Sequence, residues 1–250
     1  VIALLVESAT DCGFLPETKD IVRQLRDVID EYPGRVMVAE PSDLANATPY
    51  FGDGTDMFQM AFHFGYGYFW EYSFNSQSAQ NITESFENAL SNYPEGSQDA
   101  LVIGSHDVAR AIVRALGDET KHRRAATIQL AARGTPFLYY GEELGLRAGS
   151  EIIVDDRDRA RTPMLWTAEP GFGFSSAEPW IAFGEEPELT NLAVERDDPS
   201  SMYSFYRDFL KLRRGRALWG TGSMQLLDTG SPTIFALLRQ DDFMAYVVAV

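Results

Sequence analysis

The chain has 250 residues, of which 45% are hydrophobic, 12% aromatic and 23% charged, a composition that can bury a sizeable core and excludes an intrinsically disordered chain. Its 37 acidic residues outweigh 21 basic ones and leave a formal charge of -16. Because so negative a surface repels nucleic-acid phosphates and anionic lipids, we expect neither nucleic acid nor a membrane as a partner.

The start of the chain carries no recognisable targeting signal. Residues 1–6 are apolar, but no basic leader precedes them and Glu7 interrupts the run, so neither a signal peptide nor a membrane span is predicted. Cys12 is the only cysteine, which excludes an internal disulfide and favours a reducing compartment such as the cytoplasm.

Helical and strand-like patterns alternate along the first part of the chain. The predicted helices cover 16–32, 82–92 and 122–133, and the predicted strands cover 36–39, 57–64, 100–103 and 135–140. Short apolar strands separated by amphipathic helices predict an α/β fold with a parallel sheet. Periodicity alone leaves a doubly wound sheet and a closed barrel equally open.

The second part of the chain has a different organisation. A segment rich in Gly, Pro and Asp follows Gly141 and runs to Pro199, which is too long for an ordinary connection and is interpreted as a functional insertion. A helix is predicted over 202–212, with Gly215 after it. Three strand-like runs then predict the start of a small antiparallel domain; they cover 224–227, 233–239 and 243–250.

Acidic side chains directly follow two of the predicted parallel strands, where ligands bind in such folds. Glu40 follows the first strand, and His106 and Asp107 follow the third. Glycoside cleavage needs one acid to protonate the leaving oxygen and a carboxylate to attack or stabilise the sugar. Other interpretations stay open, because Asp107 could cap a helix starting at Val108 and His106 could be a buried core histidine.

Other chemical signatures are weak. His63 lies in an aromatic strand, and the aromatic residues at 66–70 are interpreted as core in preference to a surface that stacks on sugars. The glycine-rich stretches fit neither the dinucleotide nor the Walker phosphate pattern, and no His/Cys cluster has zinc spacing. We therefore predict no cofactor and no metal.

Six motifs occur in a fixed order: 36–40 (VMVAE), 50–54 with 60–64 (YFGDG, MAFHF), 105–107 (SHD), 134–143 (GTPFLYYGEE), 157–166 (RDRARTPMLW) and 197–201 (DDPSS). Together they resemble the α-amylase family of glycoside hydrolases, particularly its branch of α-glucosidases, oligo-1,6-glucosidases and trehalose synthases. The resemblance covers essentially the whole chain. It implies the C-terminal half of a (β/α)8 TIM barrel, over 1–217, followed by a truncated β-sandwich domain over 218–250.

The resemblance also implies roles for particular side chains. Glu40 would be the general acid and then the base, and Asp107 would bind sugar hydroxyls and stabilise the transition state. His106 and Arg157 would bind substrate at the closed end of a pocket for one terminal glucose. The implied activity is that of a retaining α-glucosidase acting on terminal α-linked glucose of short oligosaccharides, with a small oligosaccharide as the partner.

Departures from the family pattern bear on this activity. Ser105, Ala39 and Leu165 stand where the family commonly has asparagine, glycine and glutamine. The family's nucleophilic aspartate would fall immediately before Val1, and a retaining mechanism cannot run without it, so we expect the 250-residue polypeptide alone to be inactive. The alternatives are a trehalose-synthase-type transglycosylase and a non-catalytic barrel homologue. Linkage preference and oligomeric state stay open.

Overall fold

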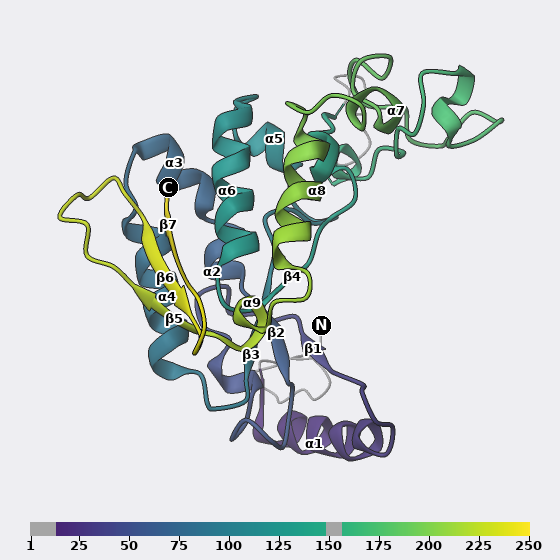
Figure 1. The fold of residues 1–250 in the computed structure, drawn as a ribbon. Coiled ribbons are helices and arrows are strands. Elements are labelled where there is room, and N and C mark those ends of the chain that lie inside the picture. Colours follow the sequence, from purple (N-terminus) through teal and green to yellow (C-terminus); the bar gives the residue numbers. More distant parts are fainter. Residues whose placement is uncertain (1–13, 149–156) are drawn as a thin grey trace.

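A parallel sheet forms the centre of the computed structural model, which describes residues 14–148 and 157–250 (Figure 1). Its strands are β1 (Val38–Ala39), β2 (Met60–Phe62), β3 (Gln98–Leu101) and β4 (Thr135–Pro136). They pair in the order β1-β2-β3-β4, and every pair is parallel. Four parallel strands in chain order, without a reversal, are the arrangement of a barrel segment and not of a doubly wound sheet.

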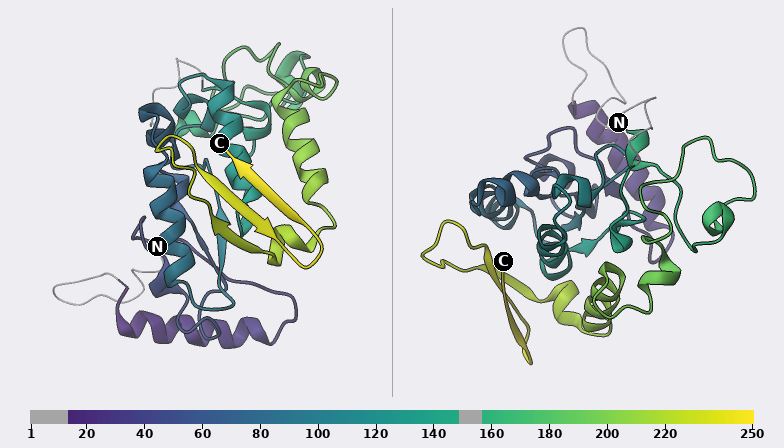
Figure 2. Two further views of the ribbon diagram at one scale, coloured as in Figure 1. Left: turned by 60° about the vertical axis from the view of Figure 1, so that its left-hand side comes forward. Right: turned by 90° about the horizontal axis from the view of Figure 1, so that it is seen from above.

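Helices connect the strands and pack around them (Figure 2). The longer ones are α1 (Pro16–Asp30), α4 (Gln80–Asn92), α6 (Glu119–Ala131) and α8 (Met202–Arg213). Their starts follow local chemistry: Pro16 occupies the first turn of α1, the Asp118 side chain accepts hydrogen bonds from the first turn of α6, and Ser201 does the same for α8. Among the described residues, none of the helices is long and apolar enough to cross a membrane.

The main core lies between the parallel sheet and its helices. It includes the fully buried Tyr66 and Trp70, which belong to the short helices α2 (Phe64–Gly67) and α3 (Trp70–Ser76). The Tyr66 hydroxyl donates to the Ala125 carbonyl, and the Trp70 indole donates to that of Ile103, so both polar groups are satisfied inside the core. The core interpretation thus holds for these two aromatic residues.

The strands are shorter than the sequence patterns predict. The run at 135–140 yields only two strand residues, although the Phe137 N–H still donates to the Leu101 carbonyl of β3. The run at 57–64 yields three, since α2 already begins at Phe64. No short helix was predicted between 64 and 76, where the aromatic residues carry little periodicity.

The long segment after β4 extends to one side of the barrel strands (green, Figure 1). It contains the short helices η3 (Glu142–Leu144), η4 (Asp158–Ala160), η5 (Pro170–Gly173) and α7 (Leu192–Glu195). An apolar cluster of its own includes Leu146 and Met164. The buried guanidinium of Arg110 holds it to the barrel by donating to the Thr162 carbonyl and hydroxyl and to the Tyr140 carbonyl.

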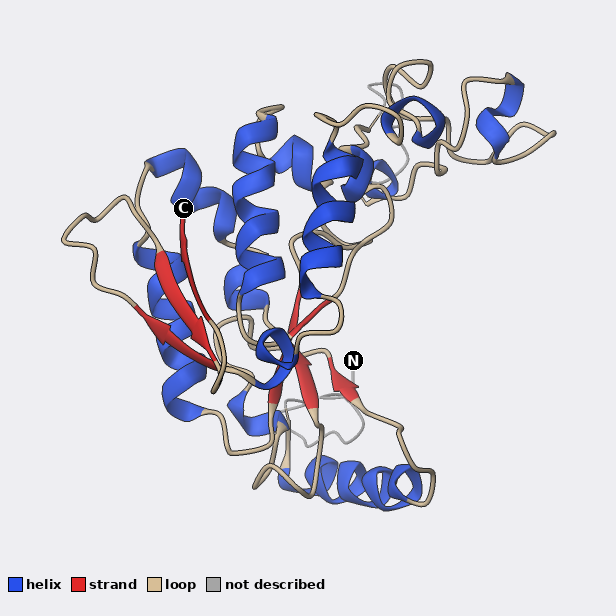
Figure 3. Ribbon diagram, viewed as in Figure 1, coloured by secondary structure: helices blue, strands red, loops and turns tan. Residues whose placement is uncertain are grey.

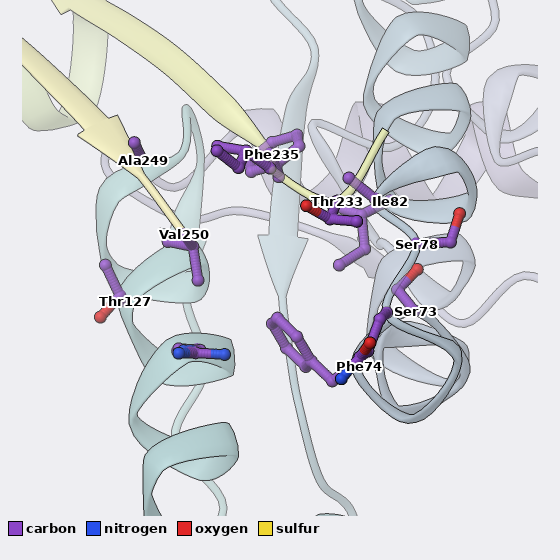
Figure 4. A pocket seen from close by; sticks show the side chains of 13 residues that line it. Ser73, Phe74, Ser78, Ile82, Thr127, Thr233, Phe235, Ala249 and Val250 are labelled. Carbon is purple, nitrogen blue, oxygen red and sulfur yellow. The ribbon is translucent and has the colours of Figure 1, made fainter. Parts of the chain in front are cut away.

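A second, antiparallel sheet follows α9 (Ala217–Thr221), and Figure 3 shows the two sheets separately. Its strands are β5 (Ser223–Leu226), β6 (Ala236–Gln240) and β7 (Ala245–Ala249), in that order. Phe235 and Leu237 pack into the main core beside α6 and α8. A pocket of about 540 Å³ remains between this sheet, α4 and α6, lined by Phe74, Phe235 and Val250 among others (Figure 4).

One buried side chain ties the antiparallel sheet to the helices α6 and α9. Arg239 of β6 is fully buried, and its guanidinium donates to the carbonyls of Ser223, Ala131, Leu218, Trp219 and Gly222. Burial lowers the pKa of Arg239 to about 10, with smaller contributions from two neighbouring arginines. The boundary between barrel and β domain at 217/218 stays a prediction.

Candidate active site

A pocket of about 220 Å³ opens where the parallel strands end. Glu40 directly follows β1 and lines it, and His106 and Asp107 reach it from the loop after β3. The two acids singled out in the sequence therefore face the same pocket. The remaining lining residues come from the ends of β2, β3 and β4 and the segments that follow them: Phe62, Phe64, Tyr68, Val102, Gly104, Ser105, Phe137, Leu138 and Tyr139.

Asp107 is the electrostatic centre of the pocket. One carboxylate oxygen, Oδ1, lies 3.2 Å from Nη1 of Arg157 and 3.5 Å from Nη2 of Arg161, and Oδ2 lies 3.6 Å from Nε2 of His106. The structure thus places Arg157 against Asp107, and both come together with His106. Arg161 was not among the predicted site residues, although it lies in the quoted Arg-Thr-Pro motif.

The competing interpretations of Asp107 and His106 do not fit the geometry. The helix after them, α5 (Ala111–Arg114), begins too late for Asp107 to cap it, and no side chain caps that helix. The His106 side chain is 63% exposed, so it is not a core histidine. Instead, the Ser105 hydroxyl accepts the Asp107 backbone N–H at 3.1 Å and fixes the turn that presents the carboxylate.

Aromatic rings form one wall of the pocket. Phe64 stacks on Tyr68 with ring centroids 4.4 Å apart, and Phe62 meets Phe137 edge-on at 5.3 Å. Burial raises the pKa of the Tyr68 hydroxyl, and the Asp107 and Glu40 carboxylates raise it further, while a hydrogen bond with Ser105 lowers it. Tyr68 therefore stays protonated as a donor. Sequence reasoning assigned this tyrosine to the core, whereas the structure places it directly after α2, where it lines the pocket.

A buried acid lies behind the pocket. Glu142 is 4% exposed, and within the described part of the chain neither carboxyl oxygen has a hydrogen-bond partner. Burial raises its pKa well above the usual range, and the nearby Glu143 adds to this, while Arg110 and Arg114 act in the opposite direction. A Cβ on Gly104 would come 2.8 Å from Oε1 of Glu142, so this glycine allows the neutral acid to pack against the site loop.

Comparison with known proteins identifies the family. The family model "Alpha amylase, catalytic domain" matches residues 8–221, which is most of the chain. The chain belongs to the alpha-amylase family. This confirms the resemblance drawn from the six motifs, and the parallel sheet followed by a small antiparallel sheet confirms the predicted fold of a partial TIM barrel with the start of a β domain.

Curated relatives carry several activities in their names. The chain is 28% identical to trehalose synthase/amylase TreS of Mycobacterium tuberculosis, covering 95% of this chain and 46% of that protein. It is 26% identical to probable oligo-1,6-glucosidase 3 of Bacillus subtilis, covering 92% and 48%. It is 27% identical to a probable alpha-glucosidase of Rhizobium meliloti, covering 91% and 46%. The chain thus spans about half the length of these relatives.

Solved structures give the same fold. The alpha-glucosyl transfer enzyme XgtA superposes with a TM-score of 0.82 at 28% identity, covering 95% of this chain and 46% of that one. MutB, as an inactive double mutant in complex with isomaltulose, superposes with a TM-score of 0.82 at 21% identity, covering 99% and 55%. The position predicted for the nucleophile precedes Val1 and lies outside the described residues.

Proposed function

We propose that this chain supplies the acid/base and sugar-binding side of a retaining α-glucosidase-type site that acts on terminal α-linked glucose of short oligosaccharides. The observation that carries the proposal is the shared pocket of Glu40 and Asp107 at the ends of β1 and β3. Glycoside cleavage requires a carboxylic acid beside the leaving oxygen, and Glu40 can supply it while Asp107 binds the sugar in the same cavity. Its wall of aromatic rings supports the same choice of substrate, because sugar faces pack well against such rings.

Glu40 acts first as the general acid in this proposal. It protonates the glycosidic oxygen while the bond to the anomeric carbon breaks, which lets the leaving sugar depart as a neutral alcohol. A second carboxylate attacks the anomeric carbon and forms a glycosyl-enzyme intermediate. Glu40, now ionised, takes a proton from the water that hydrolyses this intermediate, and the enzyme returns to its starting state.

Asp107 binds and orients the reacting glucose. Its carboxylate accepts hydrogen bonds from two neighbouring sugar hydroxyls, and these bonds strengthen as positive charge develops on the ring. Arg157 and Arg161 fix the carboxylate from one side. His106 is exposed beside it and donates to a further hydroxyl. Together these groups bind several hydroxyls of one glucose unit, which favours the terminal sugar of a chain.

The nucleophile belongs to a part of the barrel outside residues 1–250. The family resemblance assigns it to the position before Val1, and we expect the 250-residue polypeptide to show no glucosidase turnover by itself. An upstream Gly-Phe-Arg-x-Asp run ending at that position would support the enzyme proposal. Another residue at the aspartate position would contradict it for the whole protein.

A second candidate is a trehalose-synthase-type transglycosylase. Proteins of this name from Mycobacterium tuberculosis and Thermus thermophilus are among the relatives, at 28% and 29% identity. Hydrolysis and transfer share the first chemical step and differ in whether water or a sugar hydroxyl receives the glucosyl group. Incubating the enzyme with maltose distinguishes them, because a hydrolase releases glucose and a synthase forms trehalose.

The decisive experiment replaces the acid. In the protein as its organism makes it, Glu40→Gln should reduce turnover of an unactivated disaccharide such as maltose by about a thousandfold, because an amide cannot protonate the leaving oxygen. A nitrophenyl α-glucoside should lose less in the bond-breaking step, since its leaving group needs little protonation. Glu31→Gln, at an exposed position on the end of α1, is the matched control. Equal rates for the two variants would refute the assignment.

A further inference from the structure

A serine, a histidine and an aspartate outside the candidate active site form a connected chain. Ser85 comes from α4, His63 follows β2 and Asp99 lies on β3. The Ser85 hydroxyl lies 2.7 Å from Nε2 of His63, and Nδ1 of the same ring lies 3.1 Å from Oδ1 of Asp99. The order of groups and the use of the two ring nitrogens are those of a serine nucleophile with its base and orienting acid.

The surroundings of His63 determine which ring nitrogen carries the proton. The His63 and Asp99 side chains are only 4% and 3% exposed, and the ring of Phe86 packs edge-on against the imidazole. In the described part of the chain, neither Nδ1 of His63 nor Oδ1 of Asp99 has an aligned hydrogen-bond partner. The two atoms contact each other at 3.1 Å. A proton on Nδ1 interacts favourably with the Asp99 carboxylate across this contact, although the two atoms are not aligned as a hydrogen bond, and it leaves Nε2 to accept the Ser85 hydroxyl proton.

Asp99 has a second polar neighbour. Burial raises the pKa of the Tyr93 hydroxyl, and the Asp99 carboxylate, which accepts a hydrogen bond from it, raises it further. Tyr93 therefore remains a protonated donor toward the aspartate. Held from two sides in a dry environment, the carboxylate can fix the imidazole and stabilise the positive charge that forms on it.

Ser85 lies at the boundary between this buried chain and an open pocket. The pocket has a volume of about 350 Å³ and is lined by Ala45, Gly65, Phe69, Asn81, Glu84, Ser85 and Asn88. None of these residues lines the pocket of Glu40 and Asp107. A Cβ on Gly65 would approach the Ser85 hydroxyl to 2.5 Å, so only glycine leaves the oxygen unobstructed here.

Amide donors flank the serine on the same face of α4. Asn81 lies one turn before Ser85 and Asn88 one turn after it, and all three line the pocket. One N–H of the Asn88 amide holds the pocket wall through the Ala45 carbonyl. Its second N–H and the Asn81 amide are the groups that can stabilise negative charge forming beside the serine.

We propose that Ser85 is the nucleophile of an acyl-transfer site, with His63 as its general base and Asp99 as the group that orients the imidazole. Its substrate is a small neutral ester. The pocket volume limits the acyl group to a few carbons, Phe69 and Ala45 supply apolar contact, and Glu84 at the rim disfavours an anionic ester.

The reaction has two balanced steps. The Ser85 oxygen adds to the ester carbonyl carbon, its proton passes to Nε2 of His63, and the carbonyl electron pair moves to the oxygen. The intermediate collapses with cleavage of the bond to the alcohol, which leaves with the proton from Nε2. Water then attacks the acyl-serine by the same proton route, which releases the carboxylic acid and restores the Ser85 hydroxyl.

A covalent probe tests this site directly. The protein as its organism makes it is treated with a small alkyl fluorophosphonate, and peptide mass spectrometry locates the label, which we expect on Ser85. Hydrolysis of nitrophenyl acetate should fall about a hundredfold in Ser85→Ala and remain unchanged in Ser91→Ala, an exposed serine on the same helix. Asp99→Asn should also lower the rate, because the altered ring tautomer no longer accepts the serine proton.

The outcomes separate chemistry from a purely structural role. Thermal unfolding of Ser85→Ala checks that this small change leaves the fold intact. A label on any residue other than Ser85, or none, would overturn the proposal. So would equal ester hydrolysis in the Ser85 and Ser91 variants. The labelling result does not depend on glucosidase activity, so the two proposals can fail separately.

Discussion

Two histidine–aspartate pairs lie on or shortly after neighbouring strands of the same sheet, yet they occupy opposite environments. His106 and Asp107 are adjacent in sequence, 63% and 27% exposed, and 3.6 Å apart at the mouth of a pocket. His63 and Asp99 come from different segments, are almost completely buried, and lie 3.1 Å apart. The first pair can meet a substrate directly, whereas the second can act only through a group such as Ser85 that reaches solvent.

The difference follows from where each pair lies relative to its strand. His106 and Asp107 come after β3 ends, in a loop whose backbone is held by Ser105 and whose side chains are free to face the pocket. Asp99 lies within β3, and His63 lies between β2 and α2 beneath the ring of Phe86. Burial makes the inner pair, His63 and Asp99, costly to disrupt. Exposure makes the outer pair, His106 and Asp107, available for binding.

The largest effect should come from the outer pair. Replacing Asp107 by Asn in the protein as its organism makes it removes the charge that stabilises the developing oxocarbenium centre. We expect kcat/KM for a nitrophenyl α-glucoside to fall at least about a thousandfold, equivalent to about 4 kcal/mol. Asp27→Asn, at an exposed position on α1, should keep the full rate. A loss of only a few-fold would mean that Asp107 is not part of the reacting centre.

Breaking the inner pair should act on stability. His63→Leu leaves the Asp99 carboxylate buried without its closest partner, which should lower the free energy of unfolding by about 3 kcal/mol. His106→Leu changes an exposed ring and should alter it by less than about 0.5 kcal/mol. Urea unfolding of the two variants measures the contrast directly. Similar losses in both would show that burial does not distinguish the pairs.

The third histidine, His122, shows the effect of burial on a histidine that has no carboxylate contact in the described part of the chain. Burial lowers the pKa of His122 to about 3, and Arg123 adds to the effect; its ring contacts the Tyr206 hydroxyl at 3.4 Å. The unfolded chain binds a proton at this residue near pH 6.5, where the folded chain does not. Stability from His122 is therefore complete above pH 6.5 and falls by about 1.4 kcal/mol for each pH unit below it, toward pH 3.

Comparison of wild type with His122→Gln isolates the contribution of His122 to the pH dependence of stability. Unfolding free energies at several pH values between 7 and 5 should show a shallower acid dependence in the variant. Other groups contribute with other signs: burial raises the pKa of Glu195 to about 7, so its contribution is lost as pH rises from 4.5 through 7. The difference between the two proteins removes that contribution, and parallel curves would contradict the assignment.

The smallest effect should come from the turn that presents Asp107. Ser105→Ala removes the hydroxyl that accepts the Asp107 N–H, a hydrogen bond worth about 1 kcal/mol. We expect kcat/KM to decrease by a few-fold, about what a loosened carboxylate would produce. Ser105→Asn, which restores a side-chain acceptor, should recover the rate. A fall beyond about a hundredfold would indicate a direct role for Ser105 in the chemistry.

Much of the fold follows from local pattern. The predicted helix at 82–92 differs from α4 by two residues at its start, and the helix at 202–212 nearly coincides with α8, because long amphipathic stretches have a strong period. The β1 and β4 strands are only two residues long, so their ends could not be read from apolar runs. The alpha-amylase family and the partial barrel are confirmed, whereas the catalytic roles of Glu40 and Asp107 stay predictions.

The parts of the sites that escaped prediction depend on contacts between distant segments. Tyr68 and Phe137 line the pocket because the chain turns at irregular loops, where side-chain direction has no sequence period. Glu142 packs against Gly104 of the neighbouring loop, where a Cβ would come 2.8 Å from Oε1. The contact of His63 with Asp99 depends on the register of two parallel strands, which pairs Phe62 with Ala100.

The guanidinium of Arg239 joins the small sheet to the preceding chain through four carbonyl groups, those of Ala131 in α6, Leu218 and Trp219 in α9, and Gly222. Those four carbonyls would lose their donor if the sheet detached, so separation exposes or orphans several backbone groups at once. The small sheet is a separate unit in topology, but we expect it to unfold together with the helices that it contacts. Exchanging this β region between relatives would succeed only if the incoming sheet brought an arginine, or an equivalent donor, to the same position.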